Sequence, residues 1–283
     1  MRISIITVNR NDAAGLRKTI ESVVTQTAKP WQFIVIDGAS TDGSTDLLQE
    51  YAESISYSVS EPDKGIYDGM NKGIAQADGD YCIFLNSGDA FCGPTVLEAL
   101  QTSGAGTDII CGNAIILEDP PRRKVAPAEI TLRTLFNGSI CHQSALISTA
   151  LLKAENYDST LKIVADRKFF LSNIVLKGCS YQSVDVDIVD YDITGYSARN
   201  RLASEQEWQK VLAEMLPERI LLDYGRDASG PLFGSAAYEK MFVEIGRRNW
   251  RRPVYRMVRG MLSLLGTLVP SARFARQFPK KTD

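Results

Sequence analysis

The sequence predicts an α/β protein with a mostly parallel sheet flanked by helices. In the first hundred residues, short apolar runs alternate three times with amphipathic segments, which is the pattern of parallel strands joined by right-handed helical crossovers. The apolar runs are continuous, as in strands buried on both faces. A chain of 283 residues can hold one such domain and an extension. We assign residues 1–215 to the α/β domain and residues 216–283 to a helical, basic extension.

The first four strands are expected at residues 3–8, 33–36, 55–59 and 81–85. A first helix follows Asn11 or Asp12, either of which can cap it, and ends before residue 29. Helices are also expected at residues 45–51, 66–77 and 94–100. In the second of these, Ile66, Met70 and Ile74 recur at helical spacing and predict the buried face.

The second half is less regular. Strands are expected at residues 114–117, directly after Gln143, and at 181–189, and helices begin near Val164 and Arg199. Residues 118–127 and 217–235 look like loops, because they are rich in polar residues or turn formers. The helix after Arg199 has a predicted packing face, formed by Leu202, Trp208, Val211, Leu212 and Met215.

Several classes of protein are excluded by missing motifs. The five cysteines are scattered without a C-x-x-C pair, which argues against a disulfide framework or a zinc site and favours a reducing compartment. The N-terminus has no signal-peptide pattern. No G-x-G-x-x-G follows the first strand, and there is no Walker A lysine, so dinucleotide oxidoreductases and P-loop NTPases fit poorly. Phosphates would have to be held by a metal and side chains.

Charge is unevenly distributed along the chain. Residues 247–283 contain ten Lys and Arg and one acid, out of 32 basic and 34 acidic residues in all, which leaves 22 basic and 33 acidic residues before them. Residues 260–272 are uncharged but too few to span a bilayer, and they suit a helix at the membrane interface. We therefore expect a cytoplasmic protein held peripherally at the inner membrane, with no nucleic-acid partner. The alternative is a C-terminal helix docked on the domain.

Small and polar residues, Asn86, Ser87, Gly88 and Asp89, follow the fourth strand. At the carboxyl end of a parallel strand they would lie where ligands bind in open α/β sheets. Asp89 is a suitable oxygen ligand for Mg²⁺ or Mn²⁺, which take one or two carboxylates together with substrate phosphates. The alternative is a simple turn at the strand end, since all four are turn residues.

Several ordered segments resemble family 2 glycosyltransferases with the GT-A fold. They are Ser4–Arg10, Ser22–Thr27, Val35–Ser44, Ser60–Ile74 and Phe84–Asp89. The last two are similar to a bacterial branch that builds colanic acid and other surface polysaccharides, including lipopolysaccharide. The resemblance covers roughly residues 1–200 and implies a Rossmann-like sheet that binds a UDP-, GDP- or dTDP-linked sugar.

The resemblance also implies roles for individual residues. Thr7, Asn9 and Arg10 would touch the nucleotide, and Asp37 would face its base and ribose. The donor pocket would be lined by Asp63, Lys64, Asn71, Lys72, Asn86, Ser87 and Gly88, with Asp89 as the metal-binding carboxylate. Two departures matter: Gly38 replaces a second acid after the second strand, and Asn86 replaces the first acid of the D-x-D motif. Alternatively, Thr7 and Asn9 serve only as strand-end and cap residues, and Lys64 and Lys72 are solvated charges.

On the acceptor side, His142 and Gln143 resemble the family's HQ segment and would contact a phosphate or the acceptor. Asp166 fits the position of the catalytic acid, and a base there would serve inversion at the anomeric carbon. Residues 192–197 resemble a glycine-serine loop that closes over the site. The alternatives are a structural histidine and an aspartate favoured by the helix dipole.

We therefore expect an inverting, metal-dependent glycosyltransferase that acts on a lipid-linked saccharide acceptor. The alternative is a catalytically weakened sugar-nucleotide binder, or a membrane adaptor that uses the basic tail.

Overall fold

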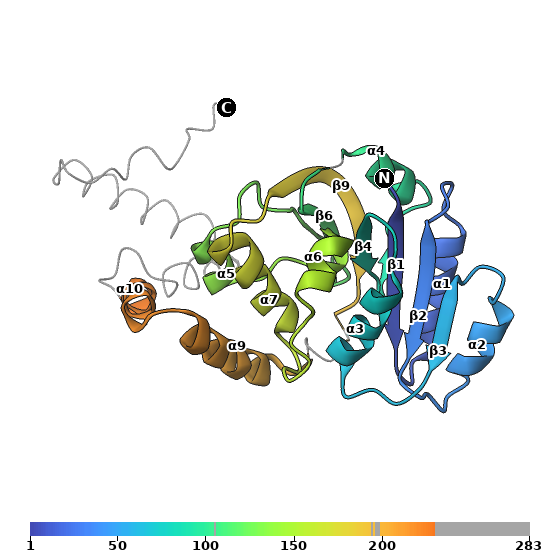
Figure 1. The fold of residues 1–283 in the computed structure, drawn as a ribbon, viewed down its shortest axis with the longest axis horizontal. Helices are drawn as coiled ribbons and strands as arrows, with labels where there is room; N and C mark the ends of the chain where they lie inside the picture. The colour runs from blue at the N-terminus through green and yellow to red at the C-terminus, as the bar shows by residue number, and fades with distance from the viewer. Residues whose placement is uncertain (105, 194, 196–198, 230–283) are drawn as a thin grey trace. The chain divides into compact units, whose positions relative to one another are not determined.

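The computed structural model describes residues 1–104, 106–193, 195 and 199–229 (Figure 1). The chain divides into two compact units, Met1–Met215 and Leu216–Asp283. The first unit contains a nine-stranded sheet in the order β3-β2-β1-β4-β8-β6-β9-β5, with β7 paired to β6.

The N-terminal half of the sheet is parallel, as the alternation of apolar runs predicts. It consists of β1 (Ile3–Asn9), β2 (Gln32–Asp37), β3 (Tyr57–Ser60) and β4 (Tyr81–Phe84). The strand β1 pairs with β2 on one side and with β4 on the other. The crossovers between these strands contain α1 (Ala13–Val24), α2 (Ser44–Glu50) and α3 (Ile66–Gln76). Because the strands run in one direction, their carboxyl ends share one edge.

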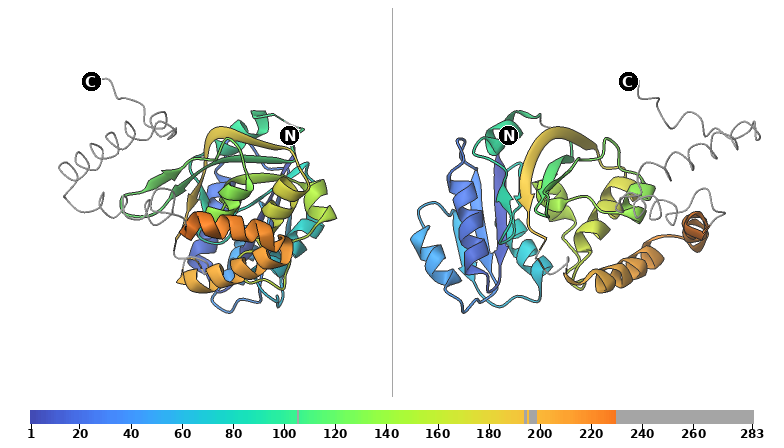
Figure 2. Two further views of the ribbon diagram at one scale, coloured as in Figure 1. Left: turned by 90° about the vertical axis from the view of Figure 1, so that its left-hand side faces the viewer. Right: turned by 180° about the vertical axis from the view of Figure 1, so that it is seen from behind.

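The later strands make the sheet mixed. They are β5 (Ala90–Phe91), β6 (Ile109–Ile116), β7 (Arg122–Lys124), β8 (Ala145–Ser148) and the long β9 (Tyr181–Tyr191). The strand β8 is antiparallel to both β4 and β6, whereas β6 and β9 are parallel. The register between β6 and β9 shifts between Cys111 and Ala114, and such irregularities bend a sheet. Figure 2 shows β9 as a strongly curved ribbon.

The two faces of the parallel half use alternate residues of β1. Ile3 and Ile5 belong to one apolar cluster with Leu16 and Ile20 of α1. On the opposite face, α3 packs closely because it has glycine where it meets the sheet. A Cβ on Gly73 would lie less than 3.0 Å from Ile6. Figures 1 and 2 show α1 and α2 on one side of these strands and α3 on the other.

The remaining helices of the first unit are mostly short. They are α4 (Val96–Thr102), α5 (Leu132–Asn137), the 3-10 turn η1 (His142–Ser144), α6 (Thr149–Ala154), α7 (Ala165–Phe170), its π-helical continuation η2 (Leu171–Leu176) and α9 (Arg201–Met215). Trp208, Val211 and Leu212 of α9 are buried, as predicted.

Four expectations about these elements were wrong. Residues 218–229 form a helix, α10 (Glu218–Ser229), in the second unit, although we expected a loop-rich segment. The predicted loop 118–127 contains β7, which pairs antiparallel with residues 114–116 of β6. Leu202 is 74% exposed because it lies at the start of α9, outside the packing face. Ile66 is also exposed, and Tyr67 takes its place on the buried face of α3 with Met70 and Ile74.

The predicted membrane-associating segment, residues 247–283, lies outside the described residues. Within the described residues, no helix combines the length and apolar character needed to cross a bilayer.

Candidate functional site

A cleft of about 860 Å³ opens at the carboxyl ends of β1 and β4. Its walls also include the start of α3, the turn η1 and the start of α7. A ligand site is expected at this edge of an α/β sheet. A second hollow, of about 670 Å³, lies near the amino end of β4 and contains none of the predicted site residues.

The fold brings most of the predicted site residues into this cleft. Those that line it are Asn9, Arg10, Asp63, Asn86, Ser87, Asp89, His142, Gln143 and Asp166. Those that do not line it are Thr7, Asp37, Lys64, Asn71, Lys72 and Gly88. The residues that do not line the cleft make contacts elsewhere in the fold, and their local sequence does not show these contacts.

Asp37 lies beneath the cleft and not in its wall. Its side chain is fully buried at the end of β2 and accepts hydrogen bonds from Asn9 Nδ2 at 2.6 Å, Ser40 Oγ at 2.6 Å and Ser60 Oγ at 2.6 Å. Burial raises the pKa of Asp37, but these hydrogen bonds outweigh it and the pKa is lowered overall. In this structure Asp37 supports Asn9 and the serine loops, and its contact with the base and ribose stays a prediction.

The residue that Asp37 supports is Asn9, which does line the cleft. The Asn9 amide donates to Asp37, and its Oδ1 accepts from Ser87 Oγ at 2.7 Å. This chain fixes the Asn9 amide and joins the end of β1 to the loop after β4. Thr7 lies two residues earlier on β1 and is fully buried. Its Oγ1 has no hydrogen-bond partner among the described residues.

The Asp63 carboxylate lies directly against Gly38, in the space that a side chain at position 38 would fill. Its carboxylate lies 3.6 Å from Nη1 of Arg10 and accepts from the backbone amide of Gly65 at 3.0 Å. The Asp63 side chain is 3% exposed, whereas that of Arg10 is 64% exposed. The pair therefore places a buried carboxylate and an exposed cation beside each other in the wall of the cleft.

The three other predicted donor residues of this segment point elsewhere. Lys64 is exposed, and it is the Lys64 carbonyl that accepts a hydrogen bond, from Lys162. Lys72 forms an ion pair with Glu61 at 2.7 Å on the surface. Asn71 exchanges two hydrogen bonds with the backbone of Tyr157, at 2.8 and 3.0 Å. Asn71 thereby ties α3 to the segment that precedes α7.

The loop after β4 holds Asp89 in a buried position. Gly88 has φ +94°, a conformation that favours glycine, and the Thr19 hydroxyl donates to the carbonyl of Asp89 at 2.6 Å. Asp89 is 4% exposed. Burial raises the pKa of Asp89 to about 7, although interactions with His142, Gln143 and Lys18 and a hydrogen bond from the Asp192 amide oppose the rise.

The residues of this loop fit a divalent cation that also binds phosphates. Asn86 presents a buried Oδ1 that has no hydrogen-bond partner among the described residues, and Asn86 and Asp89 both line the cleft. A carboxylate and an amide oxygen are hard ligands of the kind that Mg²⁺ and Mn²⁺ take beside substrate oxygens. Within the described part of the chain, no three His, Cys, Asp or Glu side chains converge to hold a metal by themselves.

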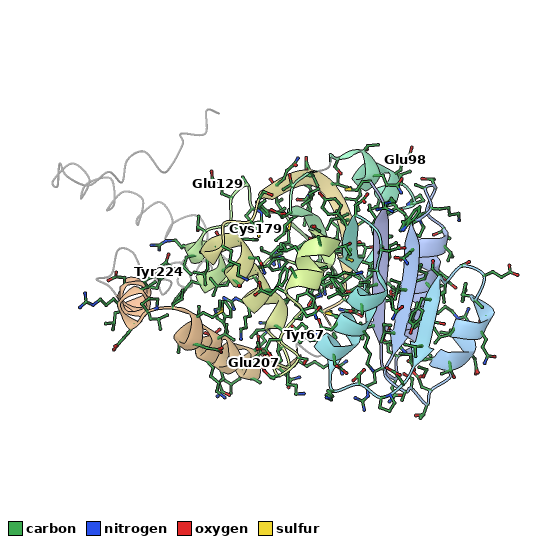
Figure 3. All side chains as sticks on the ribbon, viewed as in Figure 1. Tyr67, Glu98, Glu129, Cys179, Glu207 and Tyr224 are labelled. Atoms are coloured by element: carbon green, nitrogen blue, oxygen red, sulfur yellow. The ribbon has the colours of Figure 1, made fainter. Side chains whose placement is uncertain are left out.

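Asp166 and His142, which also line the cleft, form a largely buried pair. His142 Nδ1 lies 3.0 Å from Asp166 Oδ2, and their side chains are 13% and 14% exposed. The hydroxyl of Tyr67, on α3 (Figure 3), lies 2.8 Å from Asp166 Oδ1 and 2.7 Å from the carbonyl of Ile163. Burial raises the pKa of Asp166, but the interactions with His142 and Tyr67 outweigh it and lower the pKa overall. The carboxylate therefore stays ionised.

Two residues of unit 1 hold the start of α7 in place. Glu207 of α9 (Figure 3) accepts hydrogen bonds from three consecutive backbone amides, those of Lys162, Ile163 and Val164, at 2.7, 2.7 and 3.0 Å. The guanidinium of Arg167 lies 3.9 Å from the centre of the Trp208 ring and donates to the carbonyls of Leu135 and Phe136.

Tyr67 and Glu207 are site-supporting residues that sequence reasoning missed. Tyr67 is in the segment that carries the family resemblance, but the apolar pattern drew attention to Ile66 beside it. Glu207 has no local signal, because a glutamate in a polar helix is normally solvated. Only the packing of α9 against α7 shows its role.

Sequence comparisons place these features among known proteins. A family model described as "Glycosyl transferase family 2" matches residues 4–150. An uncharacterised glycosyltransferase of Mycobacterium tuberculosis is 34% identical over 201 residues, covering 68% of this chain and 76% of the relative. A glycosyltransferase of Mycobacterium bovis named for PGL/p-HBAD biosynthesis is 23% identical over 250 residues, covering 79% and 97%.

Solved structures with the same fold include two proteins determined in complex with nucleotide ligands. S. aureus TarS in complex with UDP superposes with a TM-score of 0.57 at 19% identity. The superposition covers 75% of this chain and 63% of the TarS chain, which is less than two thirds of TarS. The mannosyltransferase PcManGT of Pyrobaculum calidifontis, in complex with GDP-Man and Mn²⁺, superposes with a TM-score of 0.58 at 15% identity and coverages of 95% and 88%. At these identities the likeness establishes the fold, which is the GT-A-type sheet that the sequence predicts.

Proposed function

Because the chain belongs to glycosyl transferase family 2 and is therefore a glycosyltransferase, we propose that it transfers a sugar with inversion from a nucleotide donor to a hydroxyl of a saccharide acceptor. One observation carries this proposal. A single cleft is lined both by Asp89 and Asn86 and by the Asp166–His142 pair. Inversion in one step needs a base on the face of the sugar opposite the leaving diphosphate.

The donor side would bind the nucleoside diphosphate. Asn9, Arg10 and Asp63 line that end of the cleft, and Asn9 is fixed from below by Asp37. When bound beside Asp89 and Asn86, Mg²⁺ or Mn²⁺ would neutralise charge that develops on the departing diphosphate. The PcManGT structure contains GDP-Man and Mn²⁺, and the TarS structure contains UDP, so guanine and uracil nucleotides are both candidate donors for this chain.

The acceptor side would bind a hydroxyl-bearing saccharide. His142, Gln143 and Asp166 line this part of the cleft, together with the cations Lys124, Arg167 and Arg199. The cations suit an acceptor that carries phosphate, as a lipid-linked saccharide does.

Thermal unfolding of the full chain against UDP, GDP and dTDP, each with and without Mn²⁺, tests the donor site. A specific ligand at 100 times its Kd raises the free energy of unfolding by about 2.7 kcal/mol. We expect one nucleotide to stabilise the protein, more strongly with Mn²⁺. Asp89→Asn should remove the Mn²⁺-dependent part, whereas the control Asp46→Asn, an exposed acid on α2, should keep it.

A turnover assay with nucleotide-sugar donors on the same protein separates the enzyme from its alternatives. Binding without release of nucleoside diphosphate from any sugar donor would favour the weakened sugar-nucleotide binder, which the replacement of an acid by Asn86 also suggests. No binding of any nucleotide would contradict the donor-site assignment.

We also propose that the basic C-terminal segment holds the enzyme at the inner membrane, where it would act in surface polysaccharide synthesis. The proposal depends on the excess of nine positive charges in residues 247–283, ten basic against one acidic. Flotation of the full chain with liposomes containing anionic lipid should succeed at low salt and fail after truncation at residue 246. Failure of the full chain to float would contradict it.

A further inference from the structure

The helix α1 has a second face that its apolar pattern does not explain. Its apolar residues pack into the core, whereas Gly15, Thr19 and Ser22, with Gln26 just beyond the end of the helix, recur at helical spacing and contact residues 86–97. Thr19 and Gln26 are buried although they are polar. Buried polar groups need partners, so this row of residues fixes α1 against the segment that follows β4.

Thr19 attaches the loop of residues 86–89 to α1 through its hydroxyl. Its Oγ1 donates to the carbonyl of Asp89 at 2.6 Å and accepts from the backbone amide of Gly88 at 3.2 Å. The carbonyls of Gly15 and Asn86 lie farther from it, at 3.0 and 3.2 Å. A hydroxyl has one hydrogen to donate. Threonine in a helix often gives it to the carbonyl four residues earlier, but here the shortest contact leads out of the helix to Asp89.

Two further residues of α1 complete the attachment. Lys18 Nζ donates to the carbonyl of Gly88 at 2.6 Å, so both polar groups of the Gly88 backbone are bonded to α1. Gly15 permits the close approach, because a Cβ there would lie 2.8 Å from the amide nitrogen of Gly88. Glycine in a helix is normally unfavourable. Its presence at position 15 is explained by the contact between the two backbones.

A cation bound at this loop would depend strongly on how well Asp89 is placed. Asn86 stands where the family resemblance implies an acid, so Asp89 is the only carboxylate among residues 86–89. Mg²⁺ requires a defined ligand geometry and takes few protein carboxylates. Groups that hold a metal ligand in place commonly matter nearly as much as the ligand itself. A ligand that is fixed in advance also loses less conformational freedom when the ion binds.

We propose that Thr19 is a positioning residue of the donor site: its hydroxyl holds the backbone of Gly88 and Asp89 and thereby fixes the carboxylate that would bind the divalent cation. This inference rests on the proposed function. It deepens that function by assigning the preorganisation of the metal ligand to α1, whose own residues, 13–24, do not line the cleft. Thr19 therefore acts on the cation only through Asp89.

Mn²⁺ binding tests the proposal without any turnover. The full chain would be titrated with Mn²⁺ in the presence of UDP, GDP or dTDP, and free Mn²⁺ would be followed by electron paramagnetic resonance, with the same titration without protein as the blank. Thr19→Val keeps the shape of the side chain and removes the hydroxyl. We expect Mn²⁺ affinity to fall about 10- to 100-fold in Thr19→Val, the usual effect of losing a group that supports a metal ligand. Affinity for the metal-free nucleotide should be unchanged.

Three further variants separate positioning from a general loosening of α1. Thr19→Ser keeps the hydroxyl and should recover most of the Mn²⁺ affinity. Ser22→Ala also removes a hydroxyl of the row, but one that accepts from the amide of Phe91 at 3.3 Å, beyond the loop, so Mn²⁺ affinity should match the wild type. Gly15→Ala places a methyl group against the Gly88 amide and should weaken Mn²⁺ binding by displacing the loop. This variant provides the test if Thr19→Val does not fold.

The attachment of the loop can also be measured without metal or nucleotide. Thr19→Val should accelerate hydrogen exchange at the Gly88 amide, which loses its acceptor. The amide of Leu97, which donates to Gln26 at 3.0 Å, should exchange as in the wild type. Unchanged exchange at Gly88 would show that Thr19 does not hold the loop.

Three results of the Mn²⁺ titrations would overturn the proposal. Wild-type Mn²⁺ affinity in folded Thr19→Val, together with its loss in Asp89→Asn, would make Thr19 purely structural and leave the proposed donor site standing. Equal weakening in Ser22→Ala would assign the effect to α1 as a whole. If the wild type binds nucleotide but no Mn²⁺ with it, the metal site of the proposed function fails, and this inference fails with it.

Discussion

Gly38 and Asp63 lie so close that a single added methyl group would not fit between them. A Cβ built on Gly38 would lie less than 3.0 Å from Oδ2 of Asp63, and 3.4 Å from Cδ of Arg10. Gly38 follows β2 directly, whereas Asp63 belongs to the loop after β3. The absence of a side chain at Gly38 therefore lets a carboxylate from another loop occupy the place where the family resemblance implies an acid.

Gly38→Ala should weaken nucleotide binding while leaving the fold intact. The methyl group would displace the Asp63 carboxylate and its contact with Arg10. We expect roughly tenfold weaker affinity, equivalent to about 1.4 kcal/mol, the size of one weakened hydrogen bond. Calorimetric titration with the nucleotide that stabilises the wild type measures it.

Gly93→Ala is a matched control for this substitution. A Cβ on Gly93 would meet nothing within 4 Å, and Gly93 does not line the cleft. Affinity should be unchanged in Gly93→Ala. If Gly38→Ala also binds normally, the nucleotide does not use Asp63.

Asn71→Ala should reduce stability and not donor binding. It would remove both hydrogen bonds with Tyr157 and leave the backbone N–H and C=O of that residue without partners. The expected loss is about 1–3 kcal/mol in the free energy of unfolding, measured by urea denaturation. Nucleotide affinity per folded molecule should stay the same.

The neighbouring Lys72→Ala provides the comparison for Asn71→Ala. Lys72 pairs with Glu61 on the surface, and exposed ion pairs of this kind contribute only about 0–1 kcal/mol. We expect little change in stability. A variant of either residue that unfolds normally but binds nucleotide tenfold more weakly would return that residue to the donor pocket.

The parallel half of the sheet could be predicted because its physical causes are local. Continuous apolar runs mark β1, β2 and β4, and polar residues directly after them must lie at the carboxyl edge. This reasoning placed Asn9, Asn86 and Asp89 in the cleft correctly. The family resemblance, not the periodicity, singled out His142 and Asp166, which follow shorter and less regular elements.

The supporting contacts could not be predicted because their partners are distant in sequence. Asp37 looks like any acid at a strand end, and only the fold brings Ser60 and Asn9 to its oxygens. Asn71 is indistinguishable from a ligand-binding amide until Tyr157 is placed beside it. The helix α10 was mistaken for a loop because residues 217–235 are rich in polar residues and turn formers, although α10 itself is amphipathic.

Asp37→Asn should remove a contribution to stability that depends on pH in a defined direction. The pKa of Asp37 is lowered in the folded protein, so the unfolded chain binds more protons. The contribution of the carboxylate is therefore present above its ordinary pKa of about 3.9 and is lost as pH falls through its lower folded value. At pH 7 we expect the variant to be less stable by about 1–3 kcal/mol, because hydrogen bonds to a charge are lost.

The difference between wild type and Asp37→Asn should shrink when unfolding is measured at pH 3 instead of pH 7. Asp46→Asn, which alters an exposed acid, controls for general acid effects. A constant difference at both pH values would show that the charge of Asp37 does not matter. If nucleotide binding is lost while stability is unchanged, Asp37 contacts the ligand after all.

Glu207→Ala should loosen the start of α7 and thereby reduce turnover. The variant would leave the amides of Lys162, Ile163 and Val164 without their carboxylate partner, directly before the helix that carries Asp166. We expect a loss of about 2–4 kcal/mol in the free energy of unfolding, since these are charge-assisted bonds, and faster hydrogen exchange at the three amides. Glu205→Ala, an exposed glutamate on the same helix, should change neither quantity appreciably. Unaltered exchange at these three amides in Glu207→Ala would mean that α9 does not hold α7, and that the geometry of Asp166 and His142 depends on α3 and η1 alone.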